Sequence, residues 1–175
     1  MERPGVEESL SIVIADTSVL INFLAIDRMD LIQRHSCRFF ITDHVRHEVT
    51  THYSEQVSRL DLALEQGILE EIQVTDPDEV ETFARWTGLQ RFGNGECACI
   101  AVALHRQFTL AMDDKQAIKH ARRSCETLDI LTTQDLMLSM IKEDLLSIAE
   151  ADAIKHDWGS CHRFQLKIAS FGDLL

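Results

Sequence analysis

The sequence predicts an α/β protein with a central, mostly parallel sheet and helices on both faces. Two observations support this prediction. Short apolar runs rich in β-branched or aromatic residues, which are typical of buried strands, alternate along the chain with longer stretches whose apolar residues recur at helical spacing. The chain also contains only two prolines and seven glycines, which leaves little room for long linkers. Strands that alternate with helices in this way usually pair in parallel, because a parallel connection crosses over the sheet through a helix.

The first strand and the helix after it are the clearest of the expected elements. Residues 11–16 form a short apolar run that ends at Asp16, and apolar residues then recur at helical spacing. Further along, Gly67 is placed to end a helix, and Asp76 followed by proline is a typical helix start. The expected strands are 11–16, 38–41, 68–74, 108–112 and 127–131. The expected helices are 17–26, 27–33, 43–52, 55–66, one that begins at 77, one of small side chains after the glycine turn at 93–95, and then 115–123, 133–142 and 147–156.

Length and composition are those of a globular domain. The 175 residues are 45% apolar and 26% charged, which is ordinary for a folded protein with a substantial core. We expect a single domain over 1–175, with a core at about 11–131 and a C-terminal helical extension at about 132–175. Residues 1–9 are polar and are expected to form a loose lead-in.

The net charge and the cysteines restrict the function classes. A formal net charge of −12 argues against a broad basic surface that binds nucleic acid, but not against a nucleic-acid enzyme whose local positive charge is a metal ion. No apolar run reaches the roughly 20 residues that span a bilayer, and the N-terminus lacks the apolar segment of a signal peptide. We therefore expect a cytoplasmic protein that does not enter membranes. Five cysteines, an odd number, fit reduced thiols.

Acidic residues stand where the strands are expected to end. Asp16 ends the first strand, and the pair Asp113 and Asp114 follows the strand at 108–112. Glu48 and Glu96 lie near the starts of two helices. Because parallel strands end at one edge of a sheet, these acids are expected to be neighbours. Carboxylates gathered in this way repel one another, and a Mg²⁺ or Mn²⁺ ion relieves that repulsion.

Each acid also has a simpler interpretation when it is considered alone. Asp16 or one of the two adjacent aspartates would serve as a helix cap, Glu96 would favour the positive end of its helix dipole, and Glu48 would be a surface acid. Only their ordered occurrence at elements that face one edge favours a common site.

Four segments of the chain resemble the PIN-domain family, and within it the VapC-like, toxin-type members. The matching segments are 16–21, 41–49, 95–101 and 110–117. Any one of these motifs is weak, but all four occur in the family's order and spacing along about 16–131. The resemblance implies a three-layer α/β/α fold and a metal-dependent ribonuclease that hydrolyses RNA phosphodiester bonds with Mg²⁺ or Mn²⁺.

The resemblance also implies roles for individual residues. The family's catalytic acids correspond to Asp16, Glu48, Glu96 and Asp114. Asp16, Glu96 and Asp114 would hold metal, with Asp113 as an adjacent alternative, because the sequence leaves the register within the aspartate pair open. Two further residues, Thr17 and Ser18, would position substrate or water, or cap the first helix. A cognate antitoxin and a homodimer are the partners that the resemblance implies.

The chain departs from the family's usual pattern at several positions. Thr42 stands where many relatives have proline, Ala98 where a further acid is frequent, and Ile118 where arginine is common. A glycine-rich turn that is common after the last strand is replaced by 131–133. These departures affect substrate contacts and the choice of subfamily, whereas the four acids are retained.

Two other classes of function remain as alternatives. A PIN-like module that binds nucleic acid or protein without cutting would not need the intact set of acids. A phosphoryl-transfer protein with Asp16 as nucleophile would be expected to carry a second aspartate where Ser18 stands. A zinc site is disfavoured, because His47 and His52 are five residues apart and not the four that place two side chains on one helical face.

A small cluster of basic residues occurs late in the chain. It comprises Lys119, His120, Arg122 and Arg123. The cluster is either a solvated helix face or a set of contacts to nucleic-acid phosphates.

Overall fold

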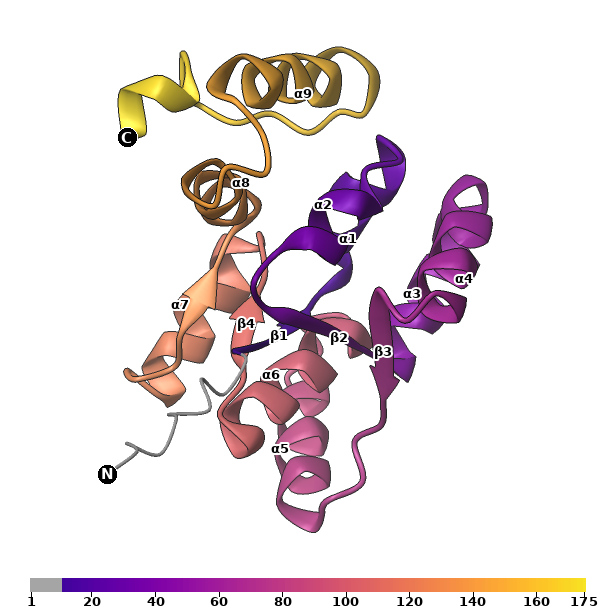
Figure 1. Cartoon of the computed structure of the whole chain (residues 1–175). Helices are drawn as coiled ribbons and strands as arrows, with labels where there is room; N and C mark the ends of the chain where they lie inside the picture. The colour runs from indigo at the N-terminus through magenta and orange to yellow at the C-terminus, as the bar shows by residue number, and fades with distance from the viewer. Residues whose placement is uncertain (1–10) are drawn as a thin grey trace, which may run out of the picture.

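The computed structural model describes residues 11–175, so the lead-in expected at residues 1–9 lies outside the described residues. Five parallel strands form one sheet in the order β3-β2-β1-β4-β5. The strands are β1 (Ile12–Ala15), β2 (Arg38–Thr42), β3 (Leu69–Ile72), β4 (Thr109–Ala111) and β5 (Ile130–Leu131). Helices cover both faces of this sheet (Figure 1). The predicted fold class, a parallel sheet between two helical layers, is confirmed.

The helices begin close to the expected positions. They are α1 (Thr17–Ala25), α2 (Met29–Arg34), α3 (Asp43–His52), α4 (Val57–Glu65), α5 (Pro77–Gly88), α6 (Asn94–Arg106), α7 (Lys115–Ser124), α8 (Thr133–Lys142) and α9 (Ile148–Cys161), with 3₁₀ turns η1 (Ser54–Gln56) and η2 (Phe171–Leu174). Gly67 follows α4 at a φ of 67°, the left-handed conformation that glycine adopts without strain. The Asp76 carboxylate accepts from the Asp78 backbone NH, and Pro77 is the first residue of α5, as predicted.

The strand order determines where a site can form. The chain adds β2 and β3 on one side of β1 and then β4 and β5 on the other. The connections therefore diverge at the carboxyl ends of β1 and β4, which is where open α/β sheets have their binding crevice. β1 ends immediately before Asp16, and the Asp16 backbone NH donates to the carbonyl of Ala111, the last residue of β4, at 2.9 Å.

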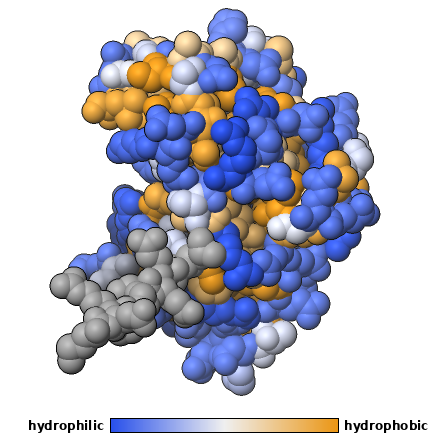
Figure 2. Space-filling model, viewed as in Figure 1, coloured by the Kyte–Doolittle hydropathy of each residue, from blue (hydrophilic) through white to orange (hydrophobic). Residues whose placement is uncertain are grey.

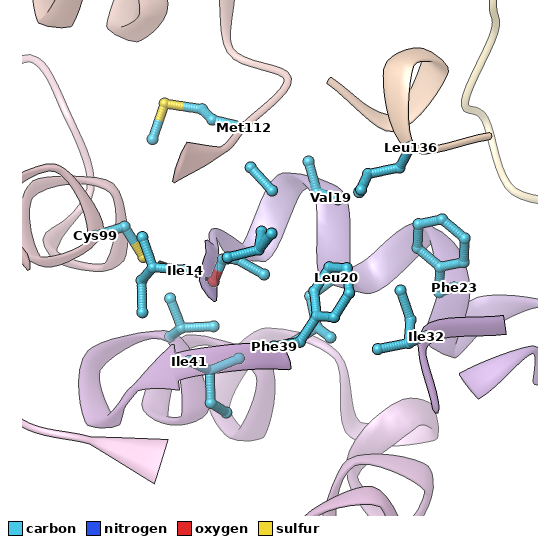
Figure 3. Packing of buried hydrophobic residues seen from close by; sticks show 14 of the residues in the cluster. Ile14, Val19, Leu20, Phe23, Ile32, Phe39, Ile41, Cys99, Met112 and Leu136 are labelled. Atoms are coloured by element: carbon cyan, nitrogen blue, oxygen red, sulfur yellow. Dashed lines mark hydrogen bonds between the residues drawn. The ribbon is translucent and has the colours of Figure 1, made fainter. Parts of the chain in front are cut away.

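Small side chains let α6 lie directly on the sheet. The helix contacts β1, β2 and β4, and its central residues, Cys97 to Ala103, are buried. The Cys99 Sγ lies 3.6 Å from the Ala15 carbonyl oxygen in the middle of the core. Figure 3 shows Cys99 beside Ile14 and Ile41, with Phe23, Phe39 and Leu20 packed together farther along the core. Cys97 and Cys99 are therefore packing residues of the core.

The C-terminal segment, residues 158–175, contributes buried side chains to the core, although its sequence shows no clear structural pattern. α9 runs five residues past the expected end at 156, because Trp158 is buried against Phe23 and Phe164. The Trp158 indole NH donates to the Asn22 carbonyl oxygen at 2.8 Å. The chain then returns along α9, and Phe171 is fully buried. In the face shown in Figure 2, hydrophobic residues gather over this C-terminal part.

Within residues 11–175, no helix combines the length and the hydropathy needed to cross a bilayer.

Candidate active site

Asp16 is buried at the carboxyl end of β1, where it caps helix α1. Its Oδ2 accepts the Ser18 backbone NH at 3.0 Å and the Ser18 hydroxyl at 2.6 Å. Its Oδ1 is buried and has no hydrogen-bond partner among the described residues. Capping therefore occupies only one oxygen of this carboxylate. A buried acceptor without a partner costs free energy, so such an atom is usually explained by a ligand or by function.

Glu48 and Glu96 meet at the N-terminus of α6. The Glu48 Oε1 accepts the Gly95 backbone NH at 2.8 Å, and its Oε2 accepts the Thr17 hydroxyl at 2.7 Å. A Cβ on Gly95 would lie 2.6 Å from the Glu48 Oε2, so glycine is needed here for the carboxylate to approach the helix. The Glu96 Oε2 accepts the Gly93 backbone NH at 2.9 Å. The positive end of the α6 dipole favours both negative charges.

The adjacent aspartates Asp113 and Asp114 have different partners. Asp113 accepts the Thr133 backbone NH at 2.8 Å, the Thr133 hydroxyl at 2.6 Å and the Asn22 amide at 3.2 Å. It therefore ties the start of α8 to α1. Asp114 caps α7 with its Oδ1, which accepts the backbone NH groups of Gln116 and Ala117. Its Oδ2 has none of these bonds.

The pKa shifts at the site also distinguish Asp114, which affects Glu96, from Asp113, which is affected mainly by burial and by Thr133. Burial raises the pKa of Glu96 to about 7, and the negative charges of Asp16, Asp114 and Glu48 contribute to this rise. Burial also raises the pKa of Asp16 to about 6. The pKa of Asp113 is raised by burial and lowered by its bonds to Thr133. The charges of Asp16, Glu48 and Asp114 thus all affect Glu96, whereas the Asp113 carboxylate is bound by Thr133 and Asn22.

The two hydroxyl residues predicted beside Asp16 orient carboxylates. Thr17 donates to Glu48, and Ser18 donates to Asp16 while it accepts the Asp113 backbone NH at 3.0 Å. Sequence reasoning missed the roles of Asn22 and Thr133, which hold Asp113. The signal for Asn22 was a single amide in the otherwise apolar helix α1, but no pattern in the sequence connects it with a threonine 111 residues later.

The carboxylates at this edge of the sheet resemble an open site for a divalent metal ion more than an enclosed one. Within residues 11–175, no three His, Cys, Asp or Glu side chains converge closely enough to enclose one ion. Mg²⁺ does not need such an enclosure, because proteins usually bind it through one or two carboxylates while it keeps several waters. The unpartnered Asp16 Oδ1 and the raised pKa values of Asp16 and Glu96 fit a cation at this edge. Asp16, Glu96 and Asp114 are the residues that would hold it.

Other residues singled out in the sequence lie elsewhere. The His44 ring stacks on Phe83 at a centroid distance of 4.7 Å, and His47 is exposed. Trp86 is buried in the core. Of the basic cluster, His120 turns toward Trp86, whereas Lys119, Arg122 and Arg123 are exposed on α7.

Comparison with known proteins identifies the fold and the family. No curated protein matches the sequence significantly. The structure of PAE2754 from Pyrobaculum aerophilum is similar over 80% of this chain and 95% of that one, with 12% identity and a TM-score of 0.52. A second similar structure is that of VapBC2 from Rickettsia felis bound to a DNA fragment from the VapBC2 promoter. The match covers 69% of this chain and 98% of that one, with 17% identity and a TM-score of 0.47.

A family model described as a PIN domain (DUF3368) matches residues 12–154. This range contains all five strands and the four interacting acids. The predicted resemblance to the PIN-domain family is thereby confirmed, and the chain belongs to this family.

Proposed function

We propose that this protein is a metal-dependent endoribonuclease of the toxin type. The observation that carries the proposal is the Asp16 Oδ1, a buried carboxylate oxygen without a partner, next to two acids that each keep an uncommitted oxygen. Keeping such a group is costly in a folded protein, and a divalent cation offsets the cost. Membership of the PIN-domain family agrees with a nuclease.

The chain's own residues would orient and hold the reacting groups. When bound, a Mg²⁺ or Mn²⁺ ion would make water more acidic and stabilise the charge on the leaving oxygen of an RNA phosphodiester. Asp16, Glu96 and Asp114 would hold that ion. In the metal-free protein the pKa of Glu96 is about 7, so its carboxyl group is partly protonated at neutral pH, and binding of the ion would release that proton. Thr17 and Gly95 fix the Glu48 carboxylate, which keeps negative charge beside Glu96.

The proposal is tested by cleavage of a mixed set of structured and single-stranded RNAs, with Mg²⁺, Mn²⁺ or chelator. We expect Asp16→Asn and Glu96→Gln to lower the rate at least about 100-fold, because each removes a charge that the transition state needs. Cleavage that persists at the wild-type rate in both variants would reveal a contaminating nuclease and refute the site.

The aspartate pair gives a sharper version of this experiment. Asp114→Asn keeps a good helix cap, so it should lose cleavage with little change in thermal stability. Asp113→Asn should mainly lower stability, by about 1–3 kcal/mol, because its bonds to Thr133 and Asn22 are partly lost. The reverse pattern would assign the metal to Asp113.

The alternative proposal is a PIN-like module that binds RNA or protein without cutting. It predicts RNA binding that is insensitive to Asp16→Asn and no heat of Mg²⁺ binding in calorimetry. The cognate antitoxin and the homodimer are proposals that rest on the resemblance to toxin-type members. Purification with the product of a neighbouring gene and a mass measurement in solution test them.

A further inference from the structure

One face of α7 carries four cations. Lys115, Lys119, Arg122 and Arg123 are exposed, whereas Ala117 and Ala121 on the opposite face are buried. In the part of the chain that the structure describes, none of the four lies within 4.0 Å of a carboxylate. Like charges at three- and four-residue spacing destabilise a helix. Arg122 and Arg123 lie in the last turn of α7, where the helix dipole favours them, but Lys115 lies in the first turn, where the dipole disfavours it.

These cations line a groove that leads to the candidate active site. A cavity of about 700 Å³ is lined by the four cations, by Ile118 and Thr132, and by one acid, Glu126. A second cavity, of about 330 Å³, shares Lys115, Ile118 and Thr132 with the first and reaches Asp113. The two form one continuous groove, which we call the α7 groove. It passes between α7 and the C-terminal segment, whose Lys167 adds a fifth cation.

The distance between the groove and the carboxylates is short. Asp114 caps α7, so Lys115 is the residue next to a candidate metal ligand. Arg122 lies seven residues further along the helix, which at 1.5 Å per residue is roughly 11 Å. A polyanion that lies along the cations of α7 would therefore reach the candidate active site at the N-terminal end of that helix.

We propose that the α7 groove binds the phosphates of single-stranded RNA next to the bond that is cut. This inference rests on the proposed ribonuclease function and names the path of its substrate. Lysine and arginine contacts to phosphates are the usual source of such affinity. The inner cavity favours RNA over an acidic polypeptide, because Phe164, Gln134 and Gln165 offer a base an aromatic side chain and amide hydrogen bonds.

The test uses the intact protein and a short, labelled single-stranded RNA of mixed sequence. The groove variant is Lys119→Ala with Arg122→Ala, and both substitutions favour helix. The control variant is Arg34→Ala with Lys142→Ala, which removes the same charge from exposed positions on α2 and α8 outside the groove. Fluorescence anisotropy in chelator gives Kd between about 50 and 200 mM salt, and cleavage with Mg²⁺ gives kcat and KM.

We expect the groove variant to raise Kd about tenfold and to lower the slope of log K against log salt by about 1.4, or 0.7 for each lost phosphate contact. KM should rise with kcat nearly unchanged, and the control variant should resemble the wild type.

Each other outcome overturns one proposal or both. A groove variant that binds and cleaves like the control refutes the groove, while loss of cleavage in Asp16→Asn would still support the ribonuclease. Weaker binding in the groove variant with undiminished cleavage in Asp16→Asn supports the groove and refutes the catalytic site. Equal competition by polyglutamate of matched charge assigns the groove to an acidic polypeptide. A wild-type protein that neither binds nor cleaves RNA refutes both.

Discussion

Two buried carboxylates at different ends of α6 have opposite environments. Glu79 on α5 and Asp16 after β1 are each only 1% exposed. Glu79 receives two bonds from the Arg106 guanidinium, at 2.5 and 2.9 Å, and this pairing lowers its pKa. Asp16 has no cation beside it in the described part of the chain, and burial raises its pKa to about 6.

This difference shows that the chain is able to neutralise a buried acid when stability is all that is required. Glu79 and Arg106 join α5 to α6 near the Gln73 carbonyl, which Arg106 also binds. At the carboxyl edge of the sheet, by contrast, hydroxyl and backbone NH groups orient the acids without neutralising them. The Asp16 region therefore lacks the one component, a positive charge, that the Glu79 region contains, as expected for a site that takes up a cation.

The largest effect is expected where the pairing in the Glu79 region is broken. Arg106→Ala leaves Glu79 buried without its cation and should lower the free energy of unfolding by about 3 kcal/mol. The matched control, Arg38→Ala, breaks an exposed pair with Glu70 and should cost less than about 0.5–1 kcal/mol. Urea unfolding measures both. Adding Glu79→Gln to Arg106→Ala should restore part of the loss, and equal costs for the two arginines would remove the contrast drawn above.

The second effect concerns the pH dependence of the metal-free protein. The folded pKa of Asp16, about 6, exceeds the ordinary value of 3.8, so between these values the folded state binds more protons than the unfolded state. Stability should therefore fall as pH rises from about 4 to 7, with Asp16 contributing about 2–3 kcal/mol. Urea unfolding in chelator at several pH values measures this fall.

Asp16→Asn is the matched variant for the pH experiment. It should make the pH profile less steep, with the slope that Glu96 contributes remaining, and it should stabilise the metal-free protein above pH 7, because a buried charge is removed. Added Mg²⁺ should raise the Tm of the wild type more than that of the variant. Parallel profiles for the two proteins would show that Asp16 is not an unpaired buried charge.

The smallest effect on stability is expected at Gly95, whose lack of a side chain lets the Glu48 carboxylate approach α6. Gly95→Ala places a methyl group against the Glu48 carboxylate and should cost about 1–2 kcal/mol as the bonds to Thr17 and Gly95 are lost. Gly88→Ala has open space within 4 Å and should be neutral or slightly stabilising. Thermal unfolding of the two variants compares them, and equal Tm values would mean that Glu48 is free to move.

The fold was predictable because its local signals agree. Buried strands, the Asp76 cap with its proline and the small residues of α6 all produce the expected elements. The strand expected at 127–131 is shorter, with only Ile130–Leu131 paired to β4. The C-terminal segment was not predictable, because Trp158 and Phe171 are buried by tertiary contacts with α1 and α9 and not by any periodic pattern.

The site was predictable only in part. The order of the acids along the chain indicated which carboxylates share an edge, because Asp16 and Asp114 follow parallel strands and Glu48 and Glu96 lie on the neighbouring helices α3 and α6. The sequence left open whether Asp113 or Asp114 faces the other acids. That choice depends on Thr133 and Asn22, which engage Asp113 from elements far apart in the chain.

Asn22 has a consequence for where this protein can be shortened. Its amide holds Asp113 and Thr133, and its carbonyl oxygen receives the Trp158 indole NH. The family match ends at 154, before that tryptophan. A version trimmed to the matched range would keep every proposed catalytic acid and still lose the clamp on α1. Residues after 154 therefore support α1 beside the acidic edge, through the backbone carbonyl of residue 22 and not through its amide side chain.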